Sequence, residues 1–405
     1  MTYPQDFQKL FLDMDSFFAS VEQQVNPQYR NKPLGVAPYT GNTGCIISAS
    51  KEAKKLGIKT GTLVGEAKKR CPEIIIKESQ PALYHIYHKK IVEALNNFSP
   101  FVSVFSIDEM TLHLTEDERN QKSATQLGLQ IKKAIKEKIG DFLTCSVGIA
   151  PNQFLAKVAA ESKKPDGLNI VQLKQLALFY KNLDLIDLPG ININMERILN
   201  YYNIKTPLDF YYATLPKLSS YLGHLGKVWY LRLHGFETDE ISTQTKTLGH
   251  SCVLAPEYRN KNRAEAVLIK LASKVGYRLR KNQLFCKGVS LSVKFINHQG
   301  EHLYSKMPAT SSTQELIASS LHLWQKIKFI APPIFIYLTA FNLEKGARQP
   351  SLFFQKEKSL DASWAMDEIN DKFGPGTIFP ATISDTQDAA PDRIPFGRPR
   401  YAIRK

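Results

Sequence analysis

The chain has 405 residues, more than one hydrophobic core usually serves, so we expect two or more domains. Its 53 basic residues outnumber the 38 acidic ones, and the net charge of +15 favours a polyanionic partner, either nucleic acid or an anionic membrane surface. No apolar run is long enough to span a bilayer, no signal peptide is visible, and five scattered cysteines fit reduced thiols, so we expect an intracellular multidomain protein.

The first 167 residues alternate short strands with helices, in the order expected of an antiparallel sheet covered by two helices on one face. A compact, lysine-rich block at 25–76 is typical of an insertion into that arrangement. The predicted elements are strands at 8–14, 45–49 and 142–149, a hairpin at 101–114, and helices at 16–24, 51–56, 62–70, 82–98, 121–139 and 153–162.

Acidic residues follow two of the predicted strands. Asp13 and Asp15 come directly behind the first apolar run, where they could cap the next helix or bind a cation. Asp108 and Glu109 lie at the bend of the predicted hairpin. Three carboxylates at neighbouring strand ends, Asp13, Asp108 and Glu109, could bind two Mg²⁺ ions, which prefer hard oxygen ligands. Such a pair can clamp the attacking and leaving oxygens of a phosphoryl transfer.

Residues 168–238 are predicted to be mostly helical and contain the turn Leu188-Pro-Gly-Ile191. This turn resembles half of a helix-hairpin-helix motif, in which backbone amides bind phosphate. The second glycine of that motif is missing, because Asn192 follows, and a plain helical turn is the alternative. The polar segment 239–245 has no apolar periodicity and is predicted to be a linker.

A third unit alternates strands and helices, and its basic residues far outnumber its acidic ones. The basic side chains of the helix at 263–280 fall close to one face, which is either solvated or binds a nucleic-acid backbone. The predicted strands are 246–254, 288–296 and 333–340, the predicted helices are 263–280 and 312–328, and the basic face consists of Lys270, Lys274, Arg278 and Lys281.

Four motifs together resemble the Y-family translesion DNA polymerases of the bacterial DNA polymerase IV type. They are Asp13-Met-Asp-Ser-Phe-Phe-Ala-Ser-Val-Glu22, Ser106-Ile-Asp-Glu109, Ser146-Val-Gly-Ile149 and Lys164-Pro-Asp-Gly167. The resemblance implies an α+β multidomain fold shaped as a right-hand polymerase. Its parts would be a ferredoxin-like palm at 1–24 and 77–167, small fingers at 25–76, a helical thumb at 168–238, a linker and α/β little finger at 239–345, and a flexible tail at 346–405.

The resemblance also assigns roles to the acidic and aromatic residues. It implies that Asp13, Asp108, Glu109 and the backbone carbonyl of Met14 hold two Mg²⁺ ions, while Asp15 has a structural role. Phe18 would be the steric gate, whose ring lies where the 2′-hydroxyl of a ribonucleotide must go. The residues expected to bind the dNTP are Phe17, Ser48, Lys51, Lys54 and Lys164.

Two lysines depart from the pattern of this family. Lys51 and Lys54 stand where the common pattern Tyr-Glu-Ala-Arg has its tyrosine and arginine. An ammonium group can neutralise a phosphate as a point charge, but it does not reproduce the two-pronged geometry of a guanidinium. We expect Lys54 to contact the triphosphate, whereas the role of Lys51 is open.

The implied partners are primer–template DNA, dNTPs and the bacterial sliding clamp, with no membrane and no second subunit. In the tail, Gln349, Leu352 and Phe353 resemble the clamp-binding peptide, which would raise the local concentration of the polymerase on DNA. The expected activity is DNA-directed, low-fidelity synthesis past damaged bases by a cytoplasmic bacterial enzyme. A non-catalytic adaptor that binds DNA and clamp, and a two-metal nuclease, are the alternatives.

Overall fold

The computed structural model describes residues 3–238, 246–345 and 354–391, the last range with side chains from Lys358 onward. The described residues up to 238 belong to one compact unit, and those from 246 belong to a second. Within these ranges, none of the helices combines the length and the apolar character needed to cross a membrane.

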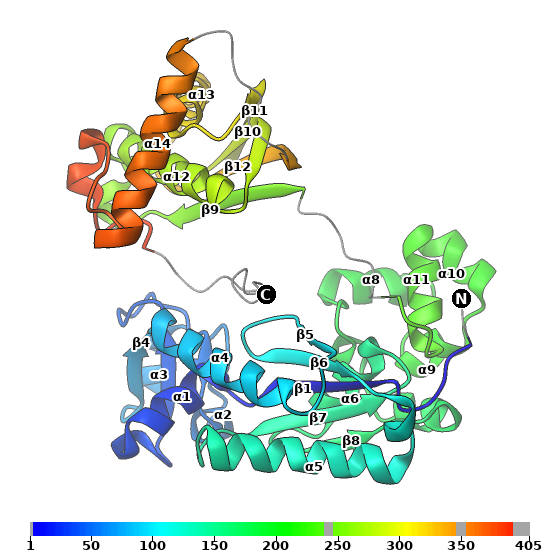
Figure 1. Cartoon of the computed structure of the whole chain (residues 1–405). Coiled ribbons are helices and arrows are strands. Elements are labelled where there is room, and N and C mark those ends of the chain that lie inside the picture. The colour runs from blue at the N-terminus through cyan, green and yellow to red at the C-terminus, as the bar shows by residue number, and fades with distance from the viewer. Residues whose placement is uncertain (1–2, 239–245, 346–353, 392–405) are drawn as a thin grey trace. The chain divides into compact units, whose positions relative to one another are not determined.

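The first unit is built on a five-stranded sheet in the order β5-β6-β1-β7-β8 (Figure 1). The central strand β1 pairs antiparallel with both β6 and β7, whereas β8 joins β7 in parallel and extends the palm beyond its predicted end at residue 167. The strands are β5 (Val102–Val104), β6 (Glu109–His113), β1 (Lys9–Met14), β7 (Cys145–Ala150) and β8 (Leu168–Ile170).

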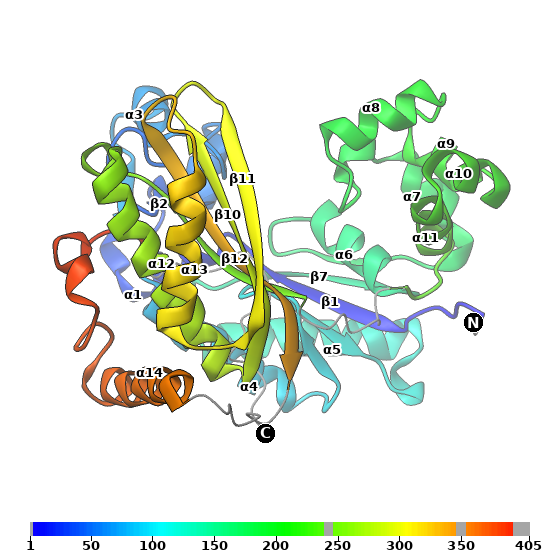
Figure 2. The same cartoon turned by 90° about the horizontal axis from the view of Figure 1, so that it is seen from above.

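Alternation along β1 separates the two faces of this sheet. Leu10, Leu12 and Met14 enter one core with the helices α4 (Pro81–Asn96) and α5 (Gln121–Lys138), as the sequence predicts. Phe11 enters a second core with α6 (Gln153–Ser162) on the opposite face (Figure 2). Asp13 follows the parity of Phe11, so its side chain is directed to the side of the sheet that α6 covers.

The fingers form a small sheet in the order β3-β2-β4 with their own apolar core. They extend to Glu78, slightly past the predicted boundary, and only Ser48–Ala49 of the predicted strand at 45–49 forms a strand. The elements are β2 (Leu34–Ala37), β3 (Ser48–Ala49), β4 (Ile75–Glu78), α2 (Lys51–Lys55) and α3 (Val64–Arg70); α1 (Phe17–Val25) connects them to β1.

The thumb is helical, as expected, and packs on α6 through the second core. Gly190 has φ +101°, a conformation that side chains rarely adopt, which explains the glycine in the turn before α8. The helices are α7 (Leu176–Lys181), α8 (Ile193–Tyr201), α9 (Pro207–Tyr212), α10 (Leu215–Leu222) and α11 (His224–Leu233).

The second unit has a four-stranded antiparallel sheet in the order β11-β10-β12-β9, with two long helices packed against it. The edge strand β11 was absent from the predicted elements, because it is polar, largely exposed and contains a proline. The elements are β9 (Thr247–Val253), α12 (Lys261–Lys281), β10 (Leu284–Phe295), β11 (Gly300–Thr310), α13 (Thr313–Lys326) and β12 (Pro333–Lys345).

The prediction of a flexible tail is wrong for residues 354–391. They form α14 (Phe354–Phe373) and a 3₁₀ helix (Ala381–Thr386), and both pack on the helices of the second unit (Figure 2). The buried Arg280 guanidinium pairs with Asp367 through contacts of 2.6 and 2.8 Å. Lys270 and Lys274 donate to backbone carbonyls of Thr386 and Ala390, so part of the predicted DNA-binding face of α12 instead holds the C-terminal segment.

Candidate active site

The ends of β1 and β6 bring two of the predicted carboxylates side by side. Asp13 and Glu109 are register partners, and the Met14 N–H donates to the Asp108 carbonyl at 2.9 Å, which closes the end of the ladder. Asp13 is buried and Glu109 is half-buried. The pairing of β1 with β6 therefore brings these two acids together at neighbouring strand ends, as the sequence predicts.

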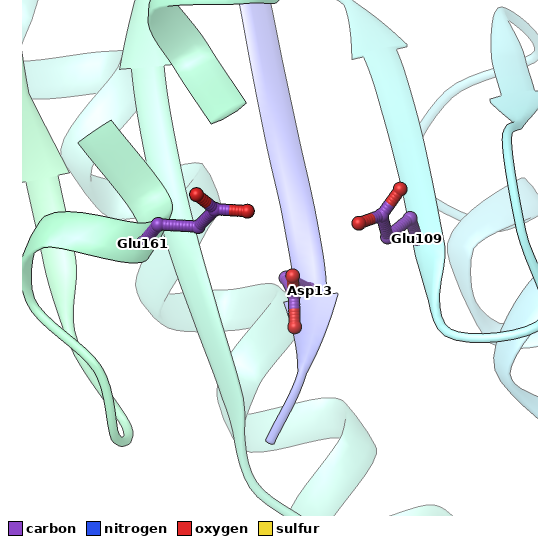
Figure 3. A group of neighbouring side chains, drawn as sticks. All are labelled: Asp13, Glu109 and Glu161. Atoms are coloured by element: carbon purple, nitrogen blue, oxygen red, sulfur yellow. The ribbon is translucent and has the colours of Figure 1, made fainter. Parts of the chain in front are cut away.

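A third carboxylate joins them from α6 (Figure 3). The ligand oxygens of Asp13, Glu109 and Glu161 all lie within 4.8 Å of one another. Asp108 lies outside this group, and its carboxylate accepts a hydrogen bond from the Ser106 hydroxyl. Glu161 was not among the predicted site residues, although its position in the last turn of a helix that packs on the Phe11 face of β1 is a signal for it.

Burial and mutual repulsion disfavour the ionised form of these carboxylates. Burial raises the pKa of Asp13 to about 7, the nearby Asp108 and Glu109 add to that shift, and Lys164 opposes it. Burial also raises the pKa of Asp108 and of Glu161 above their ordinary values. A set of hard oxygen donors that resists ionisation in the absence of a cation fits a divalent metal site.

Two lysines pair with the group. Lys164 Nζ lies 2.7 Å from Asp13 Oδ2, and Lys157 Nζ lies 2.6 Å from Glu109 Oε1. Burial alone would lower the pKa of Lys164, but the Asp13 carboxylate raises it, so this ammonium stays charged. Lys164 was predicted to contact the triphosphate and here contacts Asp13, whereas Lys157 was not predicted at all.

Asp15 has a structural role and does not cap α1. Its carboxylate accepts hydrogen bonds from the hydroxyls of Thr144 and Ser146 and from the backbone N–H of Asp166, each at 2.8 Å. These bonds fix the turn that carries Lys164 against β7. Asp15 is almost fully buried and its oxygens are engaged by these donors.

The lysines of the fingers differ in their contacts. Lys51 Nζ donates to Thr144 Oγ1 at 2.7 Å, which ties α2 to the palm. The Lys54 side chain has no hydrogen bond or ion pair among the residues that the structure describes. Burial lowers its pKa, and the nearby ammonium of Lys164 lowers it further. A cation that lies near a second cation and has no anionic partner is a favourable place for an anionic ligand.

The start of α1 offers polar groups close to these cations. Ser16 holds the N-cap position in the left-handed region at φ 49° and makes no side-chain cap. Its hydroxyl is buried with no partner among the described residues. The Ser48 hydroxyl accepts from the Ala19 N–H at 3.3 Å, so Ser48 contacts this helix.

The two aromatic residues behind Asp13 are both buried. The Phe18 ring stacks on Tyr84 of α4, with centroids 4.5 Å apart and planes 19° from parallel. Phe17 packs beside it at 5.7 Å. The Tyr84 hydroxyl donates to the Glu22 carboxylate at 2.8 Å, so the surface behind Phe18 is held rigidly. The predicted clamp-binding residues, Gln349, Leu352 and Phe353, lie outside the described residues.

Two family models match the chain. The description "impB/mucB/samB family" applies to residues 12–161, and "impB/mucB/samB family C-terminal domain" applies to residues 245–352. The DNA polymerase IV of Pelotomaculum thermopropionicum is 29% identical over 385 residues, which are 92% of this chain and 94% of that protein. The DNA polymerase IV of Saccharolobus solfataricus is 32% identical over 257 residues, which are 62% of this chain and 72% of that protein.

Solved structures show the same relationship. A Y-family DNA polymerase chimera superposes with a TM-score of 0.72 at 25% identity, covering 84% of this chain and 99% of its own. An insertion ternary complex of Dbh DNA polymerase superposes with a TM-score of 0.56 at 25% identity, covering 84% of this chain and 99% of its own. The chain therefore belongs to the impB/mucB/samB family and is a Y-family DNA polymerase of the DNA polymerase IV type.

Proposed function

We propose that this polymerase extends a DNA primer past damaged template bases with low fidelity, using two Mg²⁺ ions held by Asp13, Asp108, Glu109 and the Met14 carbonyl. The meeting of Asp13 and Glu109 at adjacent strand ends carries the proposal. Asp108 directly precedes Glu109 in the chain and lies close enough to Asp13 to raise its pKa, and its carboxylate would leave the Ser106 hydroxyl to bind the ions. When bound, the ions would bring the primer hydroxyl and the α-phosphate together and offset the charge of the transition state.

The nucleotide would bind through its triphosphate to the lysines of fingers and palm. Lys54 is the strongest candidate, because it lies near the ammonium of Lys164 and has no hydrogen bond or ion pair among the described residues. Lys164 would leave Asp13 for the triphosphate once a divalent cation takes its place. Lys51 would act from its position on Thr144, and the hydroxyl of Ser48 and the backbone at Phe17 would complete the site near the start of α1.

Sugar selection is assigned to Phe18. Its ring is supported from behind by Tyr84, so it would not move aside for a 2′-hydroxyl. Rejection would then come from a steric clash with a rigid surface. Phe17, which packs beside Phe18, supports this arrangement.

Primer–template DNA and dNTPs are the proposed partners, in line with the ternary complex of Dbh DNA polymerase. The peptide with Gln349, Leu352 and Phe353 is proposed to bind a sliding clamp, and loss of clamp binding on changing Leu352 and Phe353 to alanine would test that role. The enzyme is proposed to act as a monomer on DNA in the bacterial cytoplasm.

Primer extension with Mg²⁺ tests the proposed catalytic site. The wild-type protein should extend a primer, and Asp108→Ala should abolish incorporation while leaving DNA binding intact. A wild-type protein that binds DNA without incorporation would instead be an adaptor, and degradation of the primer without synthesis would indicate a nuclease. Extension that survives in Asp108→Ala would remove this carboxylate from the mechanism.

A further inference from the structure

The helix α6 carries a lysine that has two carboxylate partners beside the proposed metal site. Lys157 and Glu161 are separated by one helical turn, so their side chains extend from the same side of α6. Lys157 Nζ lies 2.6 Å from Glu109 Oε1 and 4.0 Å from Glu161 Oε1. One ammonium group is therefore in direct contact with one carboxylate and within a small movement of a second.

The position of Lys157 is set by its surroundings. Its ammonium lies 5.6 Å from the centre of the Phe11 ring, and Phe11 belongs to the core between β1 and α6. The side chain is only about a quarter exposed (26%), so few other positions are open to its ammonium group. Its hydrogen-bond acceptor Glu109 and its more distant ion-pair partner Glu161 are both members of the three-carboxylate group in Figure 3.

We propose that Lys157 is the resident counter-ion of Glu109 in the metal-free enzyme and passes to Glu161 when Glu109 binds a divalent cation. This inference rests on the proposed metal role of Glu109. An ammonium and a divalent cation repel each other strongly when both contact one half-buried carboxylate. Glu161 gives the displaced ammonium a new partner without exposing it or breaking the helix. The pair on α6 thereby sets the affinity of the site for metal.

Glu161 is accordingly a positioning residue that acts through Lys157. Lys164 plays the corresponding part for Asp13, with the difference that its second partner is proposed to be the nucleotide. The two ammonium groups pair with the carboxylates in the metal-free enzyme. After metal binds, each ammonium is proposed to pair with a different group.

Binding of Mn²⁺ to the full-length protein, without DNA or nucleotide, tests the proposal by a readout other than activity. Electron paramagnetic resonance of free Mn²⁺ gives the affinity. We expect Lys157→Met to bind Mn²⁺ roughly five- to tenfold more tightly, because the competitor is gone, and Glu161→Gln to bind it roughly fivefold more weakly, because the ammonium stays on Glu109. Lys163→Met removes the same charge from an exposed position at the end of α6 and should change the affinity less than twofold.

The double variant Lys157→Met with Glu161→Gln separates the proposed role of Glu161 from direct metal ligation. If Glu161 acts through Lys157, Glu161→Gln should weaken Mn²⁺ binding at least threefold less in the Lys157→Met background than in the wild-type background. An equal weakening in both backgrounds would make Glu161 a direct ligand and overturn the exchange. Unchanged or weaker binding by Lys157→Met would also overturn it.

A second measurement uses the wild-type protein and needs a variant, the conservative Lys157→Arg, only to assign one signal. With lysines ¹³C-dimethylated, the signal of Lys157, assigned by its loss in Lys157→Arg, should shift when Mg²⁺ saturates the site, while that of Lys163 should not. A Lys157 signal that saturating Mg²⁺ leaves in place would overturn the proposal. A wild-type protein that binds neither Mn²⁺ nor Mg²⁺ would instead overturn the proposed metal site itself.

Discussion

Lys164 Nζ lies 2.7 Å from Asp13 Oδ2, at the point where β1 leaves the sheet. The ion pair only partly offsets the cost of burying this carboxylate, because burial still raises the pKa of Asp13 to about 7. A lysine proposed to bind the triphosphate thus contacts a carboxylate proposed to bind the metal. Metal and nucleotide should therefore bind cooperatively, since each takes one member of the pair.

The affinity for divalent metal should rise with pH through neutrality. A cation that binds Asp13 must displace its proton, and the pKa of about 7 means that this proton is mostly present at pH 6 and mostly absent at pH 8. The apparent Mn²⁺ affinity of the protein alone should thus rise about tenfold from pH 6 to pH 8 and level off above that. An affinity that stays constant over this interval would show that Asp13 is not the group that releases the proton.

Asp13→Asn should stabilise the metal-free protein while abolishing activity. An aspartate with a pKa near 4 in the unfolded chain and about 7 in the folded one disfavours folding progressively as the pH rises from 4 to 7, and by a constant amount above 7. The variant should gain roughly 1–3 kcal/mol at pH 8 and little at pH 4.5. Chemical unfolding at the two pH values in EDTA measures this, and a variant less stable than wild type at pH 8 would contradict it.

Phe18→Ala should incorporate ribonucleotides far more readily than the wild type. Removing the ring opens the space in front of Tyr84, so discrimination by clash should fall by roughly a hundredfold, or about 3 kcal/mol in the transition state. Ratios of kcat/KM for a dNTP and its ribonucleotide give the result. Tyr84→Phe keeps the supporting ring and should keep sugar selectivity; equal selectivity in Phe18→Ala and wild type would remove Phe18 from this role.

Lys54→Ala and Lys51→Ala should differ in their effect on the KM for dNTP. Lys54 has no hydrogen bond or ion pair within the described ranges and is available to a phosphate, whereas Lys51 already donates to Thr144. We expect KM to rise roughly tenfold in Lys54→Ala and less than threefold in Lys51→Ala, because a charge-assisted contact to phosphate contributes about 1.5–3 kcal/mol. A larger effect in Lys51→Ala would mean that this lysine leaves Thr144 when the nucleotide binds.

The sequence predicted that Asp13 and Glu109 each lie at the end of a strand, because both signals are local: an apolar run that ends in an acid, and an acid at the bend of a hairpin. The pairing of β1 with β6 that joins them is not local, and the resemblance of the motifs supplied it. Glu161 escaped prediction because its place depends on which face of the sheet α6 covers. That choice is made by packing between Phe11 and α6, and the spacing of charges along the helix does not reveal it.

The second unit shows more strongly that the spacing of charges along a helix does not reveal what packs on it. The basic stripe of α12 has the spacing of a solvated or DNA-binding face, and two of its lysines instead bind carbonyls of residues 386–390. This stretch lies within residues 373–400, which are rich in proline and glycine, a composition typical of flexible chains. Tertiary contacts explain why it folds there: Ala389 and Ala390 are buried in the core of the second unit, and Arg280 of the same helix pairs with Asp367 of the preceding α14.

Asp367→Ala should release α14 from the second unit. Arg280 is nearly fully buried and forms a two-pronged pair with Asp367. Removing the carboxylate leaves a buried charge whose remaining hydrogen bonds, among the described residues, are to Ser311 and Thr313. Breaking such a pair costs roughly 3 kcal/mol. Hydrogen exchange of the full-length protein should show faster exchange in α14 and the adjoining part of α12, with the first unit unchanged.

Asp371→Ala is the matched control for this change. Asp371 lies one helical turn further along α14 and accepts a hydrogen bond from Tyr277, but it is exposed, so its loss should leave the protection of α14 almost unaltered. Rapid exchange throughout α14 in the wild-type protein would show that the segment is flexible after all. Slow exchange that depends on Asp367 and not on Asp371 would make residues 354–391 an integral part of the second unit, with the buried Arg280–Asp367 ion pair as the anchor of α14.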